Sequence, residues 1–524
     1  MGAAITVVIG AGSAGAVVAA RLAEAGHPVL LLEAGPDHRT ADTPPELAGA
    51  NFLAACNDER FVWPGLLARR TATQAPRGYL RGRAVGGSSA INAMVGMWAP
   101  PQDYQGWAEQ VGWSDAEAVP GSDPSADPGP DPGIERLKAV IEARFGLWRP
   151  PREAWSPIED ALATAALDAG HGWCADYHRA QATALGIGPA ALCLGDGRRI
   201  SANDAYLEPL RANPALRVRA NPALRVRGDA EVARILLDGA RAVGVVLQDG
   251  TTIRAGRVVV CAGALHSPAL LLHSGVRHPA IGENLGEHPS APVTLLLAPD
   301  GRISSGSVPL ISSVLRYSSG LLDEAAHPLA DGFADMQIMA MAAVGASEAD
   351  RAVAVVQAAV MRSFSRGRVG VDAAGGPVVD FDLLADERDR IRLRDGLRRV
   401  LSLTRHPAVR AVTDAVLLDD VGADDGAIEA LLGGTSEGDV AALDRWLVAH
   451  TGDYVHASGT CRMGRPEDPS AAVDAHAGAV YGYQGLHVID ASVFPWVPRV
   501  NTHLSTVLVA ERLSAGLRAV IDAG

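Results

Sequence analysis

A strand, a tight glycine turn and a helix open the chain, and this beginning constrains the fold more than any other stretch. Residues 5–10, ITVVIG, form a continuous apolar run of the kind that a strand buried on both faces requires. Residues 11–26 predict a small-residue helix that ends at Gly26, a suitable residue for the turn after a helix. Residues 27–35 predict a second buried strand ending on Glu33. Together they predict a βαβ unit.

Three glycines in this turn, Gly10, Gly12 and Gly15, form the pattern G-x-G-x-x-G. The first permits the tight turn, the second lets the backbone approach a pyrophosphate, and the third lets helix and strand pack closely. The helix N-terminus offers free N–H groups and a positive dipole end to the pyrophosphate. Glu33 is placed to accept hydrogen bonds from a ribose. The motif favours a dinucleotide site over a turn without a ligand, and it leaves NAD and FAD open.

Further strands are predicted far along the chain, at residues 241–247, 251–263 and 485–492. If they join the N-terminal unit in one sheet, the domain that contains this sheet is discontinuous. The intervening stretches, roughly 140–200 and 290–445, then predict a second domain.

Composition limits the class of protein. The chain has 524 residues, of which 48% are apolar and 20% charged, so we expect a sizeable packed core. A formal net charge of −14 argues against a nucleic-acid partner. Five cysteines without a CxxC pair predict reduced thiols and a cytoplasmic location. We find no signal peptide and no apolar run of transmembrane length in the sequence.

Two segments depart from this pattern. Residues 121–133 consist almost entirely of Pro, Gly, Asp and Ser, which predicts a mobile or disordered loop. The octapeptide RANPALRV occurs twice in tandem, at 211–218 and 219–226. This repeat is too short for a solenoid, and we expect it to lengthen a loop or hairpin before a strand near residue 232.

A second glycine cluster, residues 79–92, reads YLRGRAVGGSSAIN. Gly86 and Gly87 again allow the backbone to approach a ligand, and Ser88 and Asn92 add polar contacts. A simple NAD dehydrogenase has no use for such a loop so near the first. A flavin has a diphosphate and a wide polar ring edge, so this cluster favours FAD.

With these motifs the chain resembles the glucose-methanol-choline (GMC) oxidoreductases. The N-terminal fingerprint and GRAVGGSSAIN match the beginning of that family's pattern. GALHSPALLLHSGV at 263–276 resembles its second signature, and IGENLGEHP at 281–289 its usual sequel. HASGTCRMG at 456–464 and VIDASVFPWVPRVNTHLSTV at 488–507 resemble its C-terminal block. The landmarks occur in order along the whole chain apart from its middle.

The resemblance implies which residues contact FAD. Some members tether FAD through a histidine immediately before the Asn of the first signature, and Ile91 stands there in this chain. We therefore expect non-covalent FAD. The residues that the resemblance and the glycine motifs assign to the cofactor are Gly10, Gly12, Ser13, Ala14, Gly15, Glu33, Ala34, Arg83, Gly86, Gly87, Ser88, Asn92, Ala93, Val232, Asp490, Ala491 and Thr502.

The resemblance also implies the catalytic pair. It makes His456 the candidate general base and His503 its partner. Alcohol oxidation removes a proton from oxygen and a hydride from carbon, and the hydride needs an acceptor such as flavin N5. An imidazole can take the proton at neutral pH, and a second one can hold the alcohol oxygen so that the α-carbon hydrogen points at the acceptor.

Other interpretations of this stretch are weaker. A zinc site needs about four ligands, and no second Cys/His pair lies near in sequence. Cys461 as a nucleophile needs a base and exposure, which the sequence does not supply. We interpret His288 as a structural histidine rather than a proton carrier, and we assign no role to His266 and His273.

The fold that follows is α/β, and α+β overall. A discontinuous Rossmann-like FAD-binding domain is expected to carry a smaller substrate-binding domain built on an antiparallel sheet with helices. We expect the FAD-binding domain to contain residues 1–140, 201–290 and 448–524, and the substrate domain to contain residues 141–200 and 291–447.

The predicted reaction is the FAD-dependent oxidation of a small-molecule alcohol. Its electron acceptor is dioxygen or a quinone or other carrier, and an intracellular setting favours a dehydrogenase because peroxide is harmful there. One alternative is a redox-neutral hydroxynitrile lyase with the same fold. Two others are a catalytically silent flavoprotein and an NAD-dependent dehydrogenase. The sequence leaves the alcohol and the oligomeric state open.

Overall fold

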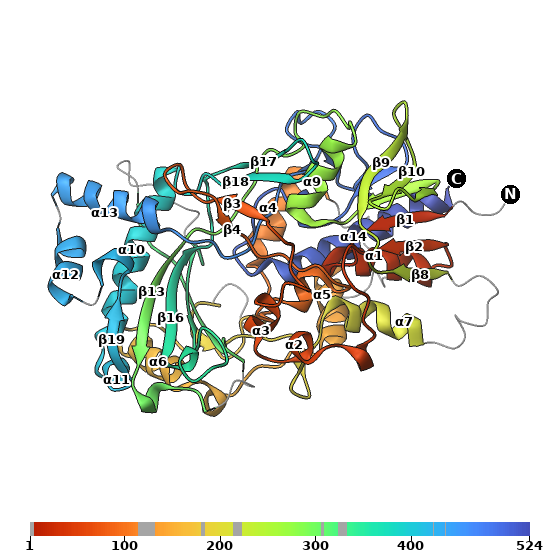
Figure 1. Ribbon diagram of the computed structural model, residues 1–524. Helices are drawn as coiled ribbons and strands as arrows, with labels where there is room; N and C mark the ends of the chain where they lie inside the picture. The colour runs from red at the N-terminus through yellow and green to blue at the C-terminus, as the bar shows by residue number, and fades with distance from the viewer. Residues whose placement is uncertain are drawn as a thin grey trace.

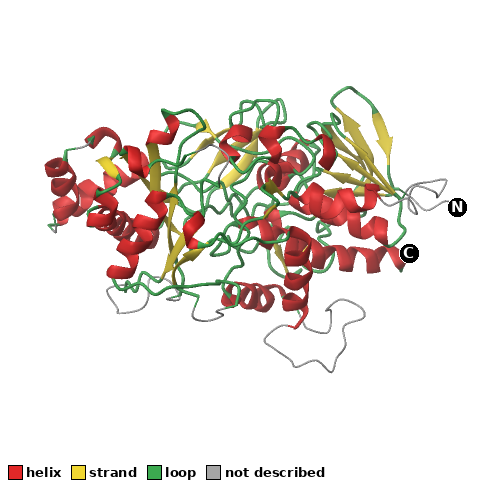
Figure 2. Ribbon diagram, turned by 90° about the horizontal axis from the view of Figure 1, so that it is seen from below, coloured by secondary structure: helices red, strands yellow, loops and turns green. Residues whose placement is uncertain are grey.

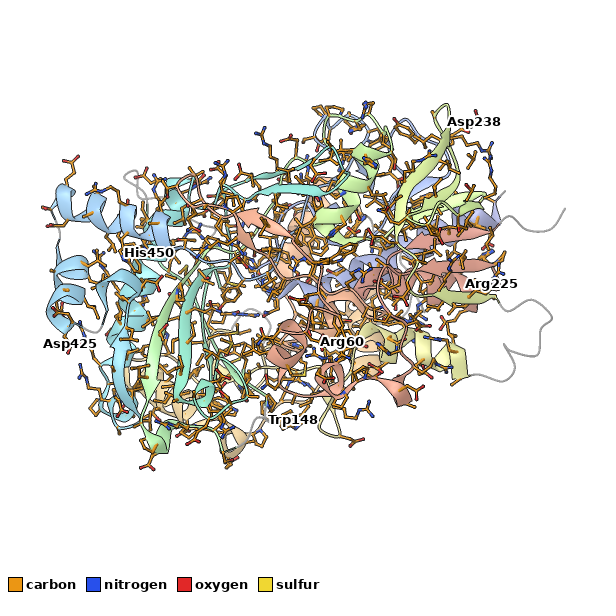
Figure 3. All side chains as sticks on the ribbon, in the orientation of Figure 1. Arg60, Trp148, Arg225, Asp238, Asp425 and His450 are labelled. Atoms are coloured by element: carbon orange, nitrogen blue, oxygen red, sulfur yellow. The ribbon has the colours of Figure 1, made fainter. Side chains whose placement is uncertain are left out.

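The computed structural model describes residues 5–113, 132–179, 184–212, 223–304, 309–322, 333–422, 424–434 and 436–523 (Figure 1). Two large sheets lie in opposite halves of the molecule. Arg225 and Asp238 mark the half that carries the N-terminal sheet, and Asp425 lies at the other end (Figure 3). The predicted loop at 121–133 lies outside the described residues except for its last two positions, which begin a helix, α5 (Pro132–Phe145).

The N-terminal sheet has five parallel strands in the order β22-β12-β1-β2-β8. Its strands are β1 (Thr6–Ile9), β2 (Val29–Leu32), β8 (Leu224–Arg227), β12 (Arg257–Val260) and β22 (Leu486–Val488). The central strand β1 is buried along its whole length, as its β-branched sequence predicts. Helices α1 (Ser13–Glu24) and α14 (Thr502–Asp522) pack together beside this sheet (Figure 1). The predicted βαβ unit and discontinuous sheet are both confirmed.

One prediction for this region was wrong. Residues 241–247 and 252–254 do not join the parallel sheet. They form a separate antiparallel sheet of β9 (Val232–Asp238), β10 (Arg241–Leu247) and β11 (Thr252–Arg254). Their connections are too short for the crossover that parallel neighbours need, so these strands must pair as hairpins.

That the tandem octapeptide lengthens a loop or hairpin stays a prediction. Residues 213–222 lie outside the described part of the chain. The end of the second copy forms β8, an edge strand that pairs with β2 from Val29↔Leu224 to Leu32↔Arg227.

The second large sheet has six antiparallel strands in the order β19-β13-β16-β15-β14-β5. Side chains of β15 alternate across it: Met336 and Ile338 pack in one core cluster, whereas Met339 belongs to the other. Helices cover the outer face at one end of the molecule (Figure 2). The strands are β5 (Gly186–Pro189), β13 (Ser290–Leu297), β14 (Ser313–Tyr317), β15 (Met336–Met341), β16 (Val353–Val360) and β19 (Thr413–Leu417), and the helices are α6 (Pro157–Asp168), α10 (Glu387–Thr404), α11 (Pro407–Arg410), α12 (Asp425–Gly433) and α13 (Glu437–His450).

A small sheet joins distant parts of the sequence. In it β3 (Leu67–Arg69) pairs with β4 (Arg77–Gly78) and with β18 (Pro377–Asp380), which continues to β17 (Arg368–Val371). Further helices are α2 (Pro45–Ala48), α3 (Phe52–Cys56), α4 (Pro101–Val111), α7 (Glu208–Ala212) and α9 (Gly263–His273). Two-stranded pairs are β6 (Leu194–Gly195) with β7 (Arg198–Arg199) and β20 (Met463–Gly464) with β21 (Val473–Asp474).

The architecture confirms the predicted fold class, a Rossmann-like unit with an antiparallel sheet and helices. The residue boundaries of the two domains stay a prediction. No helix in the described part of the chain combines the length and the apolar content needed to cross a membrane.

Candidate active site

A cavity of about 980 Å³ lies between the two large sheets. Ile9, Leu32 and Asp490 line it where strands of the parallel sheet end. Met339 of β15 and Gln357 of β16 line it from the antiparallel sheet. Ligands of open parallel sheets bind outside the carboxyl ends of the strands, and the volume is at the upper end of ligand pockets. The cavity can therefore hold a dinucleotide together with a smaller molecule.

Nearly all the residues that the sequence assigns to the cofactor meet in this cavity. The exceptions are Gly15 and Gly86, neither of which lines it. The predicted residues that do line it are Gly10, Gly12, Ser13, Ala14, Glu33, Ala34, Arg83, Gly87, Ser88, Asn92, Ala93, Val232, Asp490, Ala491 and Thr502.

The two glycine clusters pack against each other. A Cβ on Gly87 would lie 2.6 Å from Cα of Gly12, so this approach requires glycine. Gly86, with φ of +101°, donates its N–H to the carbonyl of Ala11 at 2.8 Å. A Cβ on Gly15 would lie 1.8 Å from the carbonyl oxygen of Gly10, so Gly15 serves helix packing, as predicted. The N-terminus of α1 and this backbone cradle fit the pyrophosphate of a dinucleotide.

Two buried carboxylates stand at the ends of parallel strands. Glu33 accepts N–H groups from Ala11 at 2.8 Å and from Gly35 at 3.0 Å, and burial raises its pKa to about 7. Asp490 accepts the N–H of Gly263 at 2.8 Å and the hydroxyl of Ser267 at 2.6 Å, and burial raises its pKa. Both therefore hold the backbone that lines the cavity as well as facing into it.

His456 lies at the cavity wall and is 8% exposed. Its Nδ1 is 2.8 Å from Nδ1 of His288, and its Nε2 is 3.3 Å from the amide nitrogen of Asn501. Burial, His288 and the nearby Arg81 guanidinium keep the pKa of His456 well below its usual value. The imidazole is therefore neutral at neutral pH and can accept a proton.

His503 is the second residue of α14 and lines the same cavity. Its Nδ1 is 3.0 Å from the hydroxyl of Ser13, while its Nε2 is buried without a hydrogen-bond partner. The ring packs edge-on against Phe145. Burial and then Arg199 lower the pKa of His503 to about 4. An unsatisfied buried nitrogen of this kind needs a partner that a bound molecule can supply.

Sequence reasoning missed a carboxylate beside the histidines, Glu287. One of its oxygens accepts the N–H of His288 at 2.7 Å. The other accepts the N–H of His456 at 2.7 Å and the hydroxyl of Tyr79 at 2.5 Å. Burial raises the pKa of Glu287 to about 7. The acid directly before His288 in GENLGEHP could have drawn attention to Glu287. Its partners Tyr79 and His456, however, lie far from it in the sequence.

The backbone before His456 is strained. Val455 has φ of +62°, a left-handed conformation that a β-branched residue rarely adopts. Such strain costs about 1–3 kcal/mol and persists only where the surroundings impose it. Glu287 holds the N–H of the next residue, and Arg81 donates to the carbonyl of Val455 at 2.8 Å. These contacts fix the direction in which the His456 side chain projects from the backbone.

The wall opposite the glycine clusters is formed by uncharged side chains. They come from the antiparallel sheet and from the segment before His456, and they are Ile311, Met339, Met341, Gln357 and Tyr454. His266 and His273, to which the sequence assigned no role, also line the cavity, and His266 stacks on Trp63 with ring centroids 4.2 Å apart.

Comparison with known proteins gives a consistent result. Two family models, both described as GMC oxidoreductase, match residues 4–290 and 363–510. A 5-(hydroxymethyl)furfural oxidase from Methylovorus sp. (strain MP688) is 33% identical, over 97% of each chain. An oxygen-dependent choline dehydrogenase from Vibrio vulnificus (strain YJ016) is 28% identical, over 97% of this chain and 92% of its own length. The solved structure of pyridoxine 4-oxidase from Mesorbium loti matches 98% of this chain and 99% of its own, with a TM-score of 0.77 and 24% identity, and so supports the fold.

Two glycine substitutions should separate folding from cofactor binding. Gly15→Ala places a methyl against the Gly10 carbonyl, so we expect a loss of about 2 kcal/mol or more in stability, with or without added FAD. A Cβ on Gly12 meets only Cα of Gly87, at 3.7 Å, so Gly12→Ala should leave the apoprotein as stable as the wild type. It should weaken FAD binding at least about tenfold, because the methyl stands where the pyrophosphate approaches. Thermal unfolding of apoprotein and FAD titration measure the two effects, and unchanged FAD affinity in Gly12→Ala would contradict the assigned cradle.

Proposed function

Because the chain belongs to the GMC oxidoreductase family, whose members depend on FAD, we propose that it oxidises a small uncharged alcohol to a carbonyl compound, with His456 as general base and His503 as its partner. The observation that carries the proposal is that two buried, neutral imidazoles from distant segments line one cavity. Nε2 of His503 has no hydrogen-bond partner there, and Nε2 of His456 has only the 3.3 Å contact with the Asn501 amide.

His456 and His503 have different roles in the proposed reaction. Bound FAD supplies the acceptor for the hydride. His456 takes the hydroxyl proton at Nε2, which its low pKa keeps unprotonated. Nδ1 of His503 accepts a hydrogen bond from the Ser13 hydroxyl, and its Nε2–H donates to the alcohol oxygen and orients the α-carbon hydrogen. Both rings are buried, so water is excluded from the reacting atoms.

Several features of the chain bear on the cofactor and its setting. Non-covalent FAD is supported by Ile91, an unreactive side chain that lines the cavity where some relatives carry a histidine. All five cysteines are buried and unpaired, which supports a reducing cytoplasm. Dioxygen or a quinone is the proposed electron acceptor.

The charge of the lining residues supports an uncharged substrate. Each carboxylate among them already has a partner: Asp453 pairs with Arg70 at 2.7 Å, Glu231 lies 3.6 Å from Arg83, and Asp372 accepts backbone N–H groups. Glu33 and Asp490 also hold backbone groups, as described above. A quaternary ammonium placed against Met339 and Gln357 would lack a counter-ion there, which disfavours a choline-like substrate.

Removal of the base tests the reaction directly. In His456→Ala, anaerobic reduction of bound flavin by a reactive alcohol should slow at least about a hundredfold with FAD content unchanged. His503→Ala should slow it as well and should raise the alcohol Kd, because an oxygen contact is lost. Admitting air to the reduced wild type then tests dioxygen as the acceptor. A wild type that keeps its flavin colour with every alcohol but cleaves a cyanohydrin would overturn the proposal.

The pH profile should differ from that of an ordinary histidine. The pKa of His503 is about 4 and that of His456 lies well below 6.5, so both rings stay neutral as the pH falls through 6. Protonation removes the base only at lower pH. We therefore expect kcat/KM to stay level from neutral pH down to about 5 and to fall below that. Measurement across pH 4–9 with a stable substrate checks this, with Glu287→Gln as the control because the pKa of the neighbouring Glu287 is about 7. A midpoint near 6.5 that persists in this variant would contradict it.

Uncharged alcohols should be strongly preferred as substrates over positively charged ones. An unpaired buried cation costs several kcal/mol, so kcat/KM for furfuryl or benzyl alcohol should exceed that for choline at least about a hundredfold. Gln357→Glu places a carboxylate in the wall and should narrow this ratio. Gln248→Glu, which lines the cavity beside Glu231, is the matched control and should leave the ratio unchanged. Preference of the wild type for choline would refute an uncharged substrate.

A further inference from the structure

His288 does not line the cavity, yet it makes the shorter of the two hydrogen bonds of the His456 ring. The two Nδ1 atoms lie 2.8 Å apart, with ring planes at 90° and centroids 5.0 Å apart. Two protonated nitrogens or two lone pairs at this distance would repel each other. One ring must therefore donate and the other accept, and the protonation of the two rings is coupled.

Neighbouring groups decide which ring donates. The amide nitrogen of Asn501 can only donate, so Nε2 of His456, at 3.3 Å, must accept. A neutral His456 then carries its hydrogen on Nδ1. The carbonyl groups of Met361 and Pro498 lie beside the His288 ring and favour a protonated nitrogen on it. Because Nδ1 of His288 is engaged with His456, that hydrogen belongs on Nε2, and Nδ1 of His288 is the acceptor.

We propose that His288 is a positioning residue that accepts the Nδ1 hydrogen of His456 and so holds His456 in the tautomer whose Nε2 bears a lone pair, which an alcohol hydroxyl in the cavity can use in place of the long Asn501 contact. Its consequence for catalysis rests on the proposed function, whereas the tautomer can be observed without any substrate. The proposal gives the histidine of GENLGEHP a role beyond the purely structural one predicted from sequence.

The surroundings keep this contact a hydrogen bond between neutral rings. The groups facing the pair are Glu287, Arg81, Arg366 and the ring of Tyr454. Burial lowers the pKa of His288 to about 3 and keeps that of His456 well below its usual value. Glu287 accepts the backbone N–H of both residues, which fixes the two rings relative to each other.

A metal ion is a competing explanation for this cluster. Donor atoms of Glu287, His288 and His456 lie within 4.8 Å of one another. Both oxygens of Glu287 are already occupied by backbone N–H groups, and one of them also accepts from Tyr79. The 2.8 Å contact between the two Nδ1 atoms also leaves no place for an ion between them. Hydrogen bonding therefore accounts for the cluster better than a metal does.

Two substitutions at one position test the proposal. The side-chain oxygen of Asn can replace Nδ1 of His288 as an acceptor, whereas Leu has a similar size and no acceptor. Anaerobic flavin reduction in His288→Asn should stay within about threefold of the wild type. In His288→Leu it should fall at least about tenfold with unchanged FAD content, because the wrong tautomer of His456 becomes accessible. His487→Leu removes another buried histidine, which does not line the cavity, and serves as the control.

A spectroscopic measurement makes the test independent of catalysis. In the holoprotein labelled with ¹⁵N-histidine, the signals of His456 are assigned by difference from His456→Gln. We expect a protonated Nδ1 and an unprotonated Nε2 at neutral pH. A protonated Nε2, or equal reduction rates in His288→Asn and His288→Leu, would overturn the inference. A wild type with the expected tautomer that no alcohol reduces would instead refute the proposed function and leave this inference standing.

Discussion

The buried carboxylate of Glu287 is the interaction on which the candidate site depends. It is bonded to Tyr79, His288 and His456, which lie in three distant stretches of the chain. A buried carboxylate without hydrogen bonds is very unfavourable, so all three donors must be in place for it to be tolerated. The same network holds the strained backbone of Val455 in place and so determines where the His456 side chain points. Strand pairing brings the chain segments together, and this carboxylate converts their proximity into a defined geometry.

The sequence predicted the structure best where the preferences of neighbouring residues favour the same geometry as their position in the fold. The apolar run of β1, the glycine turn and the helix after it each demand the same βαβ geometry, and the structure has it. The residues of β10 are as apolar as those of β12, so composition did not distinguish these two strands. What separates them is the length of the connections, which dictates antiparallel hairpins. The edge strand β8 was missed because four residues with alternating arginines carry little hydrophobic signal.

The candidate site also contains residues that could be predicted from sequence and residues that could not. Glycines 10, 15, 86 and 87 could be placed from sequence, because a close backbone contact or a positive φ at each position requires a residue without a side chain. Gly12 could be placed because a pyrophosphate approaches there. His456 and His503 came from motifs that resemble those of a known family. The pairing of His456 with His288 could not be predicted, since the two lie 168 residues apart and meet only through the packing of separate segments. Asn501 immediately precedes α14, but its side chain makes no cap and its amide contacts His456 instead.

The isolation of the imidazole pair has a consequence for the order of events in turnover. The His288 ring lies beside the backbone carbonyls of Met361 and Pro498, which do not relay protons, and its Nε2 makes no side-chain hydrogen bond among the described residues. The chain of hydrogen-bonded groups that begins at His456 therefore ends inside the protein. In the proposed reaction a proton taken up by His456 therefore has no onward path through that ring to solvent. It must depart through the cavity by which the alcohol entered. Release of the carbonyl product and deprotonation of His456 are then linked, because the proton leaves only when water enters the cavity again.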